Sequence, residues 1–361
     1  MKIDHVTLWR LKVPLYEPYN LSLVALSELD SIVAEIRDAD GRTGFGDCTV
    51  IPGYTPETGD GAWRFCQAHA VRLPGMDAAA AKTSFDPFRS SDPHAVSVLQ
   101  VALEMLEENP LLDPPAQAAR IPILSPVNSK DAGVIPGEIE RLLAQGYRTL
   151  KVKVGWDVDK DLERLALIQR VNAGRAVLRL DANQGYSAAD GIRFAQGLDP
   201  ASIELFEQPS HCDDWAANAA VAAVSPVPVM MDESIYGFAD IDRAAAMPGC
   251  GYVKLKISKM TGVDLLAEGL RRIRGKGLRP VLGNGAATDI GCWVEASVAR
   301  REIDNAGEMC GFLKNRAQLL ETPLTFDGGA IVLPPGYRPR LDHRVLDRLA
   351  VATHACGRSR F

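Results

Sequence analysis

Apolar and polar positions alternate near the start of the chain and then change to a helical spacing. Alternation is typical of half-buried strands, and it predicts strands at residues 3–13, 29–37 and 43–48. Asp40 and Gly41 supply a tight turn between the last two strands, which we expect to form a hairpin. Helical spacing then predicts helices over 61–72 and 94–107. These elements indicate an α+β domain over residues 1–115.

Short apolar runs separated by helical stretches begin at residue 121, after a proline-rich segment. Such runs are typical of parallel strands in βα units. Eight runs follow one another: ILSPV, TLKVKVG, VLRLDAN, IELFEQP, VPVMMDES, YVKLKIS, PVLGN and a weaker run at 305–311. Their final polar residues recur every 24 to 28 residues, the length of one βα unit. We expect an α/β fold with a (β/α)8-type barrel over 116–322, because no GxGxxG motif supports the alternative, a doubly wound open sheet.

The tail of the chain, 323–361, contains one more strand-like segment, LTFDGGAIVLP. We expect this tail to return to the N-terminal domain and pack on it.

Composition and charge exclude several functions. The 361 residues are 47% hydrophobic and 24% charged, with a net charge of −6 and no basic stretch longer than RRIRGKGLR, which argues against nucleic acid or an anionic membrane as partner. No apolar run reaches the roughly 20 residues that span a bilayer, and the first residues lack the features of a signal peptide. The seven scattered cysteines predict reduced thiols without a disulfide framework or a zinc site. We expect a cytoplasmic protein that forms a homo-oligomer.

Three successive runs end in a carboxylate: Asp181 in LDAN, Glu207 in FEQP and Asp232 in MDES. Active sites of (β/α)8 barrels lie at the C-terminal ends of the strands, so these acids should converge there. Three uncompensated carboxylates would repel one another unless they bound a cation. Oxygen ligands without His or Cys favour Mg2+ over zinc. The sequence therefore predicts a Mg2+ site, although each acid alone could instead cap the helix that follows it.

Two pairs of lysines occupy alternate positions in predicted strands. Lys151 and Lys153 share one face of the second run, and Lys254 and Lys256 share one face of the sixth. Helices cover the outer face of a barrel, so these lysines should point inward, where neighbouring ammonium groups lower each other's pKa and favour action as a base. We expect Lys153 and Lys256 to flank a substrate from opposite sides. The alternative, a solvated lysine paired with surface acids, suits Lys259 and in part Lys254.

The motifs KVKVG, DAN, FEQP, MDES and KLKISK, in this order, resemble those of the enolase superfamily, specifically its muconate lactonizing enzyme subgroup. The resemblance covers nearly the whole chain. It implies an N-terminal α+β capping domain over 1–115, a modified TIM barrel over 116–322, and a C-terminal return over 323–361 that completes the capping domain.

The resemblance also implies roles for single residues. The implied Mg2+ ligands are Asp181, Glu207 and Asp232, and the implied acid/base groups are Lys153 and Lys256. Lys151 would assist at the substrate carboxylate. Glu308 matches a glutamate on the eighth strand of cycloisomerases, where dipeptide epimerases usually carry an aspartate motif. Asn284, in a loop that departs from the cycloisomerase pattern, is expected to contact the substrate.

One further branch, that of mandelate racemase, uses a His–Asp dyad on the sixth and seventh strands. None of the six histidines lies at either strand end, and His211, near the rim, is expected to face solvent. We therefore expect an enzyme that removes the proton α to the carboxylate of a small acid, giving a metal-stabilised enediolate, with cycloisomerase chemistry foremost. The alternatives are racemisation or epimerisation of an amino acid or dipeptide, dehydratase or synthase chemistry at the same site, and a non-enzymatic binding barrel. Loops 16–26 and 50–58 are expected to set specificity.

Overall fold

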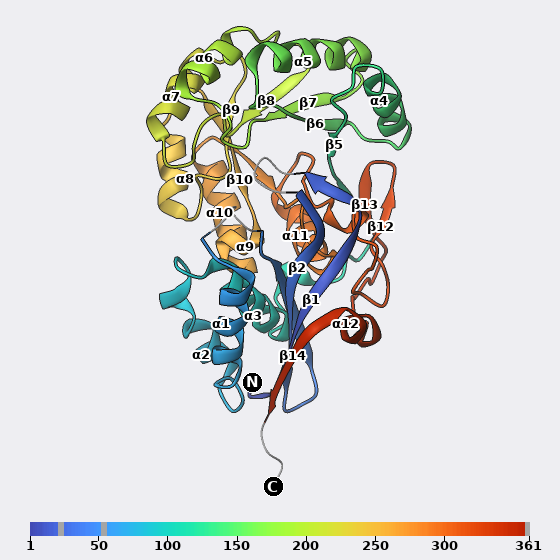
Figure 1. Cartoon of the computed structure of the whole chain (residues 1–361). Helices are drawn as coiled ribbons and strands as arrows, with labels where there is room; N and C mark the ends of the chain where they lie inside the picture. The colour runs from blue at the N-terminus through green and yellow to red at the C-terminus, as the bar shows by residue number, and fades with distance from the viewer. Residues whose placement is uncertain (21–24, 52–55, 358–361) are drawn as a thin grey trace.

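The computed structural model describes residues 1–20, 25–51 and 56–357, and it consists of a barrel and a smaller β-rich domain beside it (Figure 1). The predicted loops 16–26 and 50–58 lie in part outside the described residues, at 21–24 and 52–55. None of the described helices is long and apolar enough to cross a membrane.

The smaller domain is built on an antiparallel sheet with the strand order β14-β1-β2-β3. Its strands are β1 (Ile3–Asn20), β2 (Ala25–Asp38), β3 (Thr43–Thr49) and β14 (Ala350–Gly357). The predicted hairpin between β2 and β3 is confirmed. Gly41 in its turn has φ +87°, a conformation that favours glycine.

Three helices complete this domain: α1 (Gly59–Ala70), α2 (Ala78–Thr83) and α3 (Pro93–Leu106). The predictions of α1 and α3 are confirmed within two residues at each end. α3 packs directly on β3, where a Cβ on Gly44 would lie 2.1 Å from the carbonyl oxygen of Ala102. Only glycine allows this close approach. The Glu104 carboxylate of α3 accepts a hydrogen bond of 2.6 Å from the Val263 amide, which links this domain to the barrel.

The barrel contains a seven-stranded parallel sheet in sequential order. Its strands are β5 (Ser125–Val127), β6 (Thr149–Lys153), β7 (Val177–Asp181), β8 (Ile203–Glu207), β9 (Val229–Met231), β10 (Cys250–Leu255) and β11 (Arg279–Leu282). The helices between and after them are α4 (Ile135–Ala144), α5 (Val158–Asn172), α6 (Ala188–Gln196), α7 (Trp215–Val224), α8 (Phe238–Ala245), α9 (Ile257–Met260), α10 (Val263–Gly275) and α11 (Asp289–Glu302). In Figure 1, α4 to α8 form an arc outside the strands. The first seven predicted runs are thus strands of one curled sheet.

The prediction of an eighth strand at 305–311 is wrong. The segment is rich in glycine and lacks the β-branched residues that favour strands. It forms only one parallel bridge, between Ile123 and Gly307. The amide of Glu308 donates to the Leu282 carbonyl (2.9 Å), and the amide of Gly307 donates to Pro122 (2.9 Å). These bonds join the two edges of the sheet, so the segment takes the place of the eighth strand in the modified barrel.

The C-terminal tail divides between the two parts of the molecule. LTFDGGAIVLP forms the hairpin β12 (Thr325–Asp327) and β13 (Ala330–Leu333), which pairs with β4 (Ala119–Pro122) and not with the first domain as predicted. After the hairpin, α12 (His343–Leu349) contacts β1, and β14 pairs with β1 over residues 350–357. The C-terminal segment therefore completes the sheet of the capping domain, while the exact boundaries at 115 and 322 stay a prediction.

Candidate active site

The three predicted acids lie side by side at the C-terminal ends of neighbouring strands. Asp181 ends β7, Glu207 ends β8, and Asp232 follows β9. The register pairs Asp181 with Glu207 across the two strands. All three side chains are buried. The parallel arrangement therefore brings the acids together as the sequence predicts.

Unusual backbone conformations follow the first two acids. Asn183 (φ 41°) and Gln208 (φ 36°) adopt left-handed conformations directly after their strands. The Asn183 amide donates to Asp181 Oδ1 (2.9 Å), and the Asp232 amide donates to Gln208 Oε1 (3.1 Å). The second bond joins the ends of β8 and β9, and the amide of Ala182 donates to the Glu207 carbonyl (3.1 Å), which joins the ends of β7 and β8.

Two lysines lie between the acids. Lys151 Nζ is 2.7 Å from Asp181 Oδ2, 2.9 Å from Glu207 Oε2 and 2.9 Å from Glu308 Oε1. Lys254 Nζ is 3.1 Å from Glu207 Oε1 and 3.4 Å from Asp232 Oδ2, and it also contacts Glu308. Each ammonium group thus bridges two of the three predicted metal ligands.

Lys153 and Lys256 approach the acids from opposite sides. Lys153 Nζ donates to Asp181 Oδ2 (2.6 Å) and contacts Asn183 Oδ1. Lys256, directly after β10, donates to Asp232 Oδ2 (2.7 Å). Their strands are separated by β7, β8 and β9 in the sheet, and both lysines line one small cavity of about 30 Å3.

The same cavity gathers most of the other predicted residues. Its lining includes Lys151, Asp181, Asp232, Asn284 and Glu308. Glu207 is not part of this lining but contacts two residues that are, Lys151 and Lys254.

Lysines balance part of the negative charge of the three acids, whereas the sequence led us to expect that a metal ion alone would balance it. Burial alone would raise the pKa of Asp181, but Lys151 and Lys153 outweigh burial and lower it to about 2. Burial and the repulsion of Asp181 raise the pKa of Glu207 to about 7, although Lys151 and Lys254 oppose this. The lysines supply much of the charge balance that the sequence reasoning assigned to a metal alone.

The expected mutual lowering of lysine pKa values is also wrong for Lys151 and Lys254. Burial lowers both pKa values, but neighbouring carboxylates raise them above the ordinary range, foremost Asp181 and Glu207 for Lys151 and Glu207 and Glu308 for Lys254. Lys259 differs from its expected solvated position, because it is 2% exposed and donates to Asp232 Oδ1 (3.2 Å). Burial lowers the pKa of Lys259 to about 8.

The residues fit a hard divalent cation. The donor set consists of carboxylate oxygens, which Mg2+ prefers. Glu233 Oε2, next in the chain to Asp232, is buried and has no hydrogen-bond partner within the described ranges. Its other oxygen accepts from Asn183 Nδ2 (2.8 Å). A buried carboxylate oxygen without a donor is what a neighbouring cation or its water would satisfy.

Sequence reasoning missed two contacts of this site. The Asn183 side chain contacts both Lys153 and Glu233. The DAN motif, of which Asn183 is the last residue, could have indicated this contact. Lys254 contacts both Glu308 and Glu207 and so joins Glu308 to the acids. Its alternation with Lys256 could have indicated that Lys254 points into the site.

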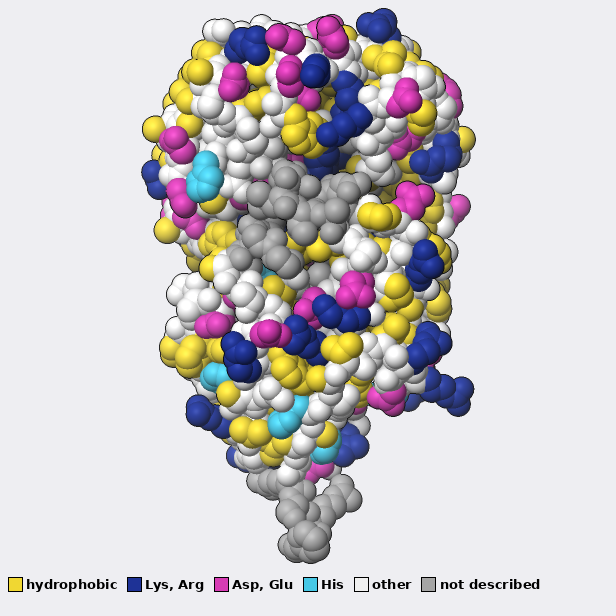
Figure 2. Space-filling model, in the orientation of Figure 1, with side chains coloured by type: hydrophobic (Ala, Val, Ile, Leu, Met, Phe, Trp, Pro, Cys, Tyr) yellow, Lys and Arg dark blue, Asp and Glu magenta, His cyan; other side chains and the backbone are white. Residues whose placement is uncertain are grey.

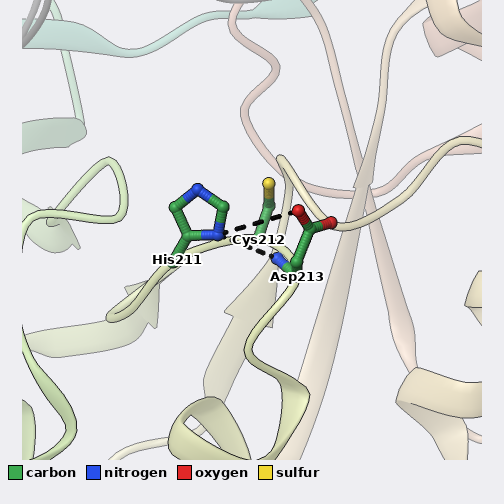
Figure 3. A group of neighbouring side chains, drawn as sticks. All are labelled: His211, Cys212 and Asp213. Carbon is green, nitrogen blue, oxygen red and sulfur yellow. Dashed lines mark hydrogen bonds and ion pairs between the residues drawn. The ribbon is translucent and has the colours of Figure 1, made fainter.

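His211 lies outside this cavity. It faces solvent as predicted, with 67% of its side chain exposed, beside Cys212 and Asp213 on the loop after β8 (Figure 3). All seven cysteines are free thiols.

Comparison with known proteins decides the family. Residues 136–338 match the family model described as Enolase C-terminal domain-like. The chain belongs to the enolase superfamily. Its barrel is the part that this superfamily model covers.

Curated relatives in the superfamily are enzymes with several reactions. The chain is 30% identical to the L-Lys-D/L-Arg epimerase of Methylococcus capsulatus, over 73% of this chain and 77% of the relative. It is 26% identical to muconate cycloisomerase 1-2 of Acinetobacter lwoffii, over 97% of this chain and 95% of the relative. The resemblance to the mandelate racemase/muconate lactonizing enzyme family of the enolase superfamily is thus confirmed, and these two relatives are isomerases of different types.

Solved structures show the same fold. The dipeptide epimerase of Cytophaga hutchinsonii, solved with Mg and the dipeptide D-Ala-L-Val, superposes with a TM-score of 0.88 at 22% identity, over 99% of this chain and all of that one. The capping domain and the barrel of this chain therefore have the fold of that structure.

Proposed function

We propose that the protein is a Mg2+-dependent enzyme that removes the proton α to the carboxylate of a small acid. The observation that carries this proposal is the pair Lys153 and Lys256, which reach one cavity from β6 and from the end of β10. Each contacts a different acid of the predicted metal set, Asp181 or Asp232. A carboxylate held at those acids would therefore have one lysine near each of its faces.

The chain's own residues divide the work of proton transfer. Asp181, Glu207 and Asp232 would hold Mg2+, which, when bound, stabilises the negative charge that develops on the substrate carboxylate. A neutral lysine on one face removes the α-proton, and the ammonium of the other lysine donates a proton or steadies the charge. Lys151, held by Glu308, positions the substrate carboxylate.

Cycloisomerase chemistry is the leading reaction in this proposal. A muconate cycloisomerase is among the relatives that align over nearly the whole chain, as is an L-Ala-D/L-Glu epimerase, which leaves the choice to Glu308. Glu308, the residue that resembles the cycloisomerase motif, is fixed in the site by Lys151 and Lys254.

Epimerisation is the second candidate, because lysines on opposite faces can remove a proton on one side and return it on the other. The L-Lys-D/L-Arg epimerase relative supports it. A cytoplasmic homo-oligomer stays a prediction, which light scattering after gel filtration and cell fractionation would test.

The test has two arms. Exchange of α-protons in D2O, followed by NMR across a library of carboxylates, should occur with Mg2+ and stop with a chelator. In calorimetric titration, Glu207→Gln should lose Mg2+ affinity while the exposed Glu163→Gln, a control of equal charge change, keeps it. Equal affinity in both variants, or exchange that is indifferent to Mg2+, would contradict the proposal.

A further inference from the structure

The carboxylate of Glu295, in α11, is not part of the lining of the candidate active site but contacts two segments that are. Glu295 Oε1 accepts a hydrogen bond of 3.0 Å from the amide of Ile257, the residue directly after Lys256. Glu295 Oε2 accepts one of 3.0 Å from the amide of Asn284. Lys256 and Asn284 both line the small cavity that holds the acids. One side chain therefore joins the backbone at a predicted acid/base group to the backbone at a predicted substrate contact.

The Glu295 carboxylate is wholly buried, with an exposed fraction of 0%. Many Asp and Glu side chains are instead spread over the face of the molecule in Figure 2, where water solvates them. Burial raises the pKa of Glu295 to about 7, although the amides of Ile257 and Asn284 and the charge of Lys256 oppose this rise. A buried carboxylate is costly unless hydrogen bonds satisfy it. Here each of its oxygens has an amide donor from a different segment of the site.

The segment that begins at Lys256 needs an acceptor from elsewhere in the fold. Lys256 is the N-cap residue of α9, and its side chain makes no capping hydrogen bond. An ammonium group has no acceptor atom, and that of Lys256 donates to Asp232 Oδ2 (2.7 Å). A short polar side chain at the N-cap ordinarily accepts from the first amides of a helix. The Glu295 carboxylate takes this part for the amide of Ile257.

The loop that contains Asn284 is also tied to the end of β10. The amide of Gly283 donates to the Leu255 carbonyl (3.1 Å), and Asn284 Oδ1 accepts from the amide of Ala286 (3.1 Å). Asn284 and Ala286 both line the cavity. A displacement of Glu295 would therefore move this part of the cavity wall together with the backbone that carries the acid/base group.

We propose that Glu295 is a positioning residue that sets the place of Lys256 relative to the substrate. This inference rests on the proposed function, since it takes Lys256 to be one of two acid/base groups. Glu295 holds the backbone of Lys256 through Ile257 and the neighbouring cavity wall through Asn284. It thereby fixes the distance between the Lys256 ammonium and a substrate that contacts this wall.

Lys153, the acid/base group expected on the opposite face, is held by different residues. Its ammonium donates to Asp181 Oδ2 (2.6 Å) and contacts Asn183. Its strand, β6, is separated from β10 by three strands of the sheet. A displacement of the segment after β10 should therefore slow proton exchange on one face of the substrate and leave exchange on the other face unchanged.

Exchange of α-protons in D2O with Mg2+, measured on separate enantiomers of one carboxylate, tests this inference. The enantiomer whose exchange is lost in Lys256→Ala reports the Lys256 face, and the one whose exchange is lost in Lys153→Ala reports the Lys153 face. In Glu295→Gln, the side-chain oxygen can accept from one amide while the NH2 group faces the other, so one of the two bonds is lost. Exchange on the Lys256 face should fall at least about tenfold, since a misplacement of about 1 Å can cost about 100-fold. Exchange on the Lys153 face and Mg2+ affinity should stay unchanged.

Glu104→Gln is the matched control. Glu104 is a buried carboxylate of α3 that also accepts from two backbone amides, those of Val263 (2.6 Å) and Asp264 (3.4 Å), and it does not line the cavity. This variant should keep wild-type exchange on both faces. A second variant, Glu295→Asp, keeps the charge but is too short to reach both amides. It should show the same one-sided loss, and it decides the question if Glu295→Gln does not fold.

The outcomes separate this inference from the proposed function. Equal loss on both faces in the Glu295 variants, no loss on either face, or the same one-sided loss in Glu104→Gln would overturn the inference alone. A wild-type protein without Mg2+-dependent exchange would overturn the proposed function and this inference with it. Lysine variants that do not divide the enantiomers would overturn the arrangement of two bases, and the inference would fall with that arrangement.

Discussion

Replacing Lys254 by methionine should destabilise the metal-free protein and tighten Mg2+ binding. The Lys254 side chain is 2% exposed, and its ammonium lies 3.1 Å from Glu207 Oε1 and 3.4 Å from Asp232 Oδ2. The variant leaves these carboxylates and Glu308 buried with one cation fewer. Breaking a buried ion pair from one side typically costs about 3–5 kcal/mol of unfolding free energy, and we expect a loss of this size without metal.

The gain in metal affinity follows from the same distances. Since Nζ lies 3.1 Å from Glu207 Oε1 and a magnesium–oxygen bond measures about 2.1 Å, the ammonium and a bound ion would lie on the order of 5 Å apart. Charges of +1 and +2 at that distance repel by roughly 1.7 kcal/mol even at the dielectric constant of water. Removal of the ammonium should therefore strengthen Mg2+ binding roughly 20-fold or more.

Urea unfolding with and without Mg2+, together with calorimetric titration of Mg2+, measures both effects. Saturating Mg2+ should recover part of the lost stability, because the ion replaces the missing positive charge. Lys82→Met, which breaks the partly exposed pair with Glu107, should change stability by no more than about 1 kcal/mol and leave Mg2+ affinity unchanged. Unchanged Mg2+ affinity in Lys254→Met would refute the placement of this ammonium at the metal carboxylates.

Two further predictions concern the framework. Burial raises the pKa of Asp47 to about 7, so the folded protein binds this proton more tightly than the unfolded chain, and stability should fall as pH rises from about 4 to about 7. The Asp47→Asn variant can still accept the hydrogen bond from Thr288 Oγ1. In urea unfolding, its stability should match that of the wild type near pH 4 and exceed it by up to about 4 kcal/mol above pH 7. A stability difference that does not change with pH would contradict this prediction. Gly283→Ala should lower unfolding free energy by about 1–3 kcal/mol, because Gly283 has φ +130° and a Cβ would lie 2.6 Å from the Glu308 amide nitrogen; a loss below about 0.5 kcal/mol would show that the segment yields easily.

The position of the acids could be predicted because it depends on local pattern. Each of Asp181, Glu207 and Asp232 ends an apolar run, and parallel strands in sequential order place successive ends at one rim. The inward direction of Lys151 and Lys153 could be predicted for the same reason, because residues two apart in a strand point to the same face.

The ion pairs could not be predicted, because they depend on depth and side-chain direction. Lys259 follows Lys256 by three residues in α9, and only the short helix after β10 turns it back towards Asp232. Lys254 of β10 reaches past the neighbouring strand β11 to Glu308, 54 residues away in the chain. The carboxylates around Lys254 reverse the expected lowering of its pKa, whereas burial keeps the pKa of Lys259 lowered despite its contact with Asp232.

One fold prediction failed and another was confirmed only in part, because β14 pairs with β1 as expected of the tail but the hairpin before it does not. The segment around Gly307 satisfies its backbone by bonds to Leu282 and Pro122 without an extended strand. The hairpin turns at Gly328 and Gly329, both with positive φ, and its partner β4 is some 200 residues earlier. Apolar pattern alone indicates a strand but not the strand with which it pairs.

The most direct test of the account is α-proton exchange by the two lysine variants on separate enantiomers of one exchangeable chiral carboxylate. In D2O with Mg2+, Lys153→Ala should retain exchange with one enantiomer and Lys256→Ala with the other, because in the proposed function each lysine would face one side of the bound carboxylate. The exchange that is lost should fall about 100-fold to 10,000-fold, as for other acid/base groups. Loss of both enantiomers in both variants, or near wild-type exchange of both in either variant, would contradict two bases on opposite faces.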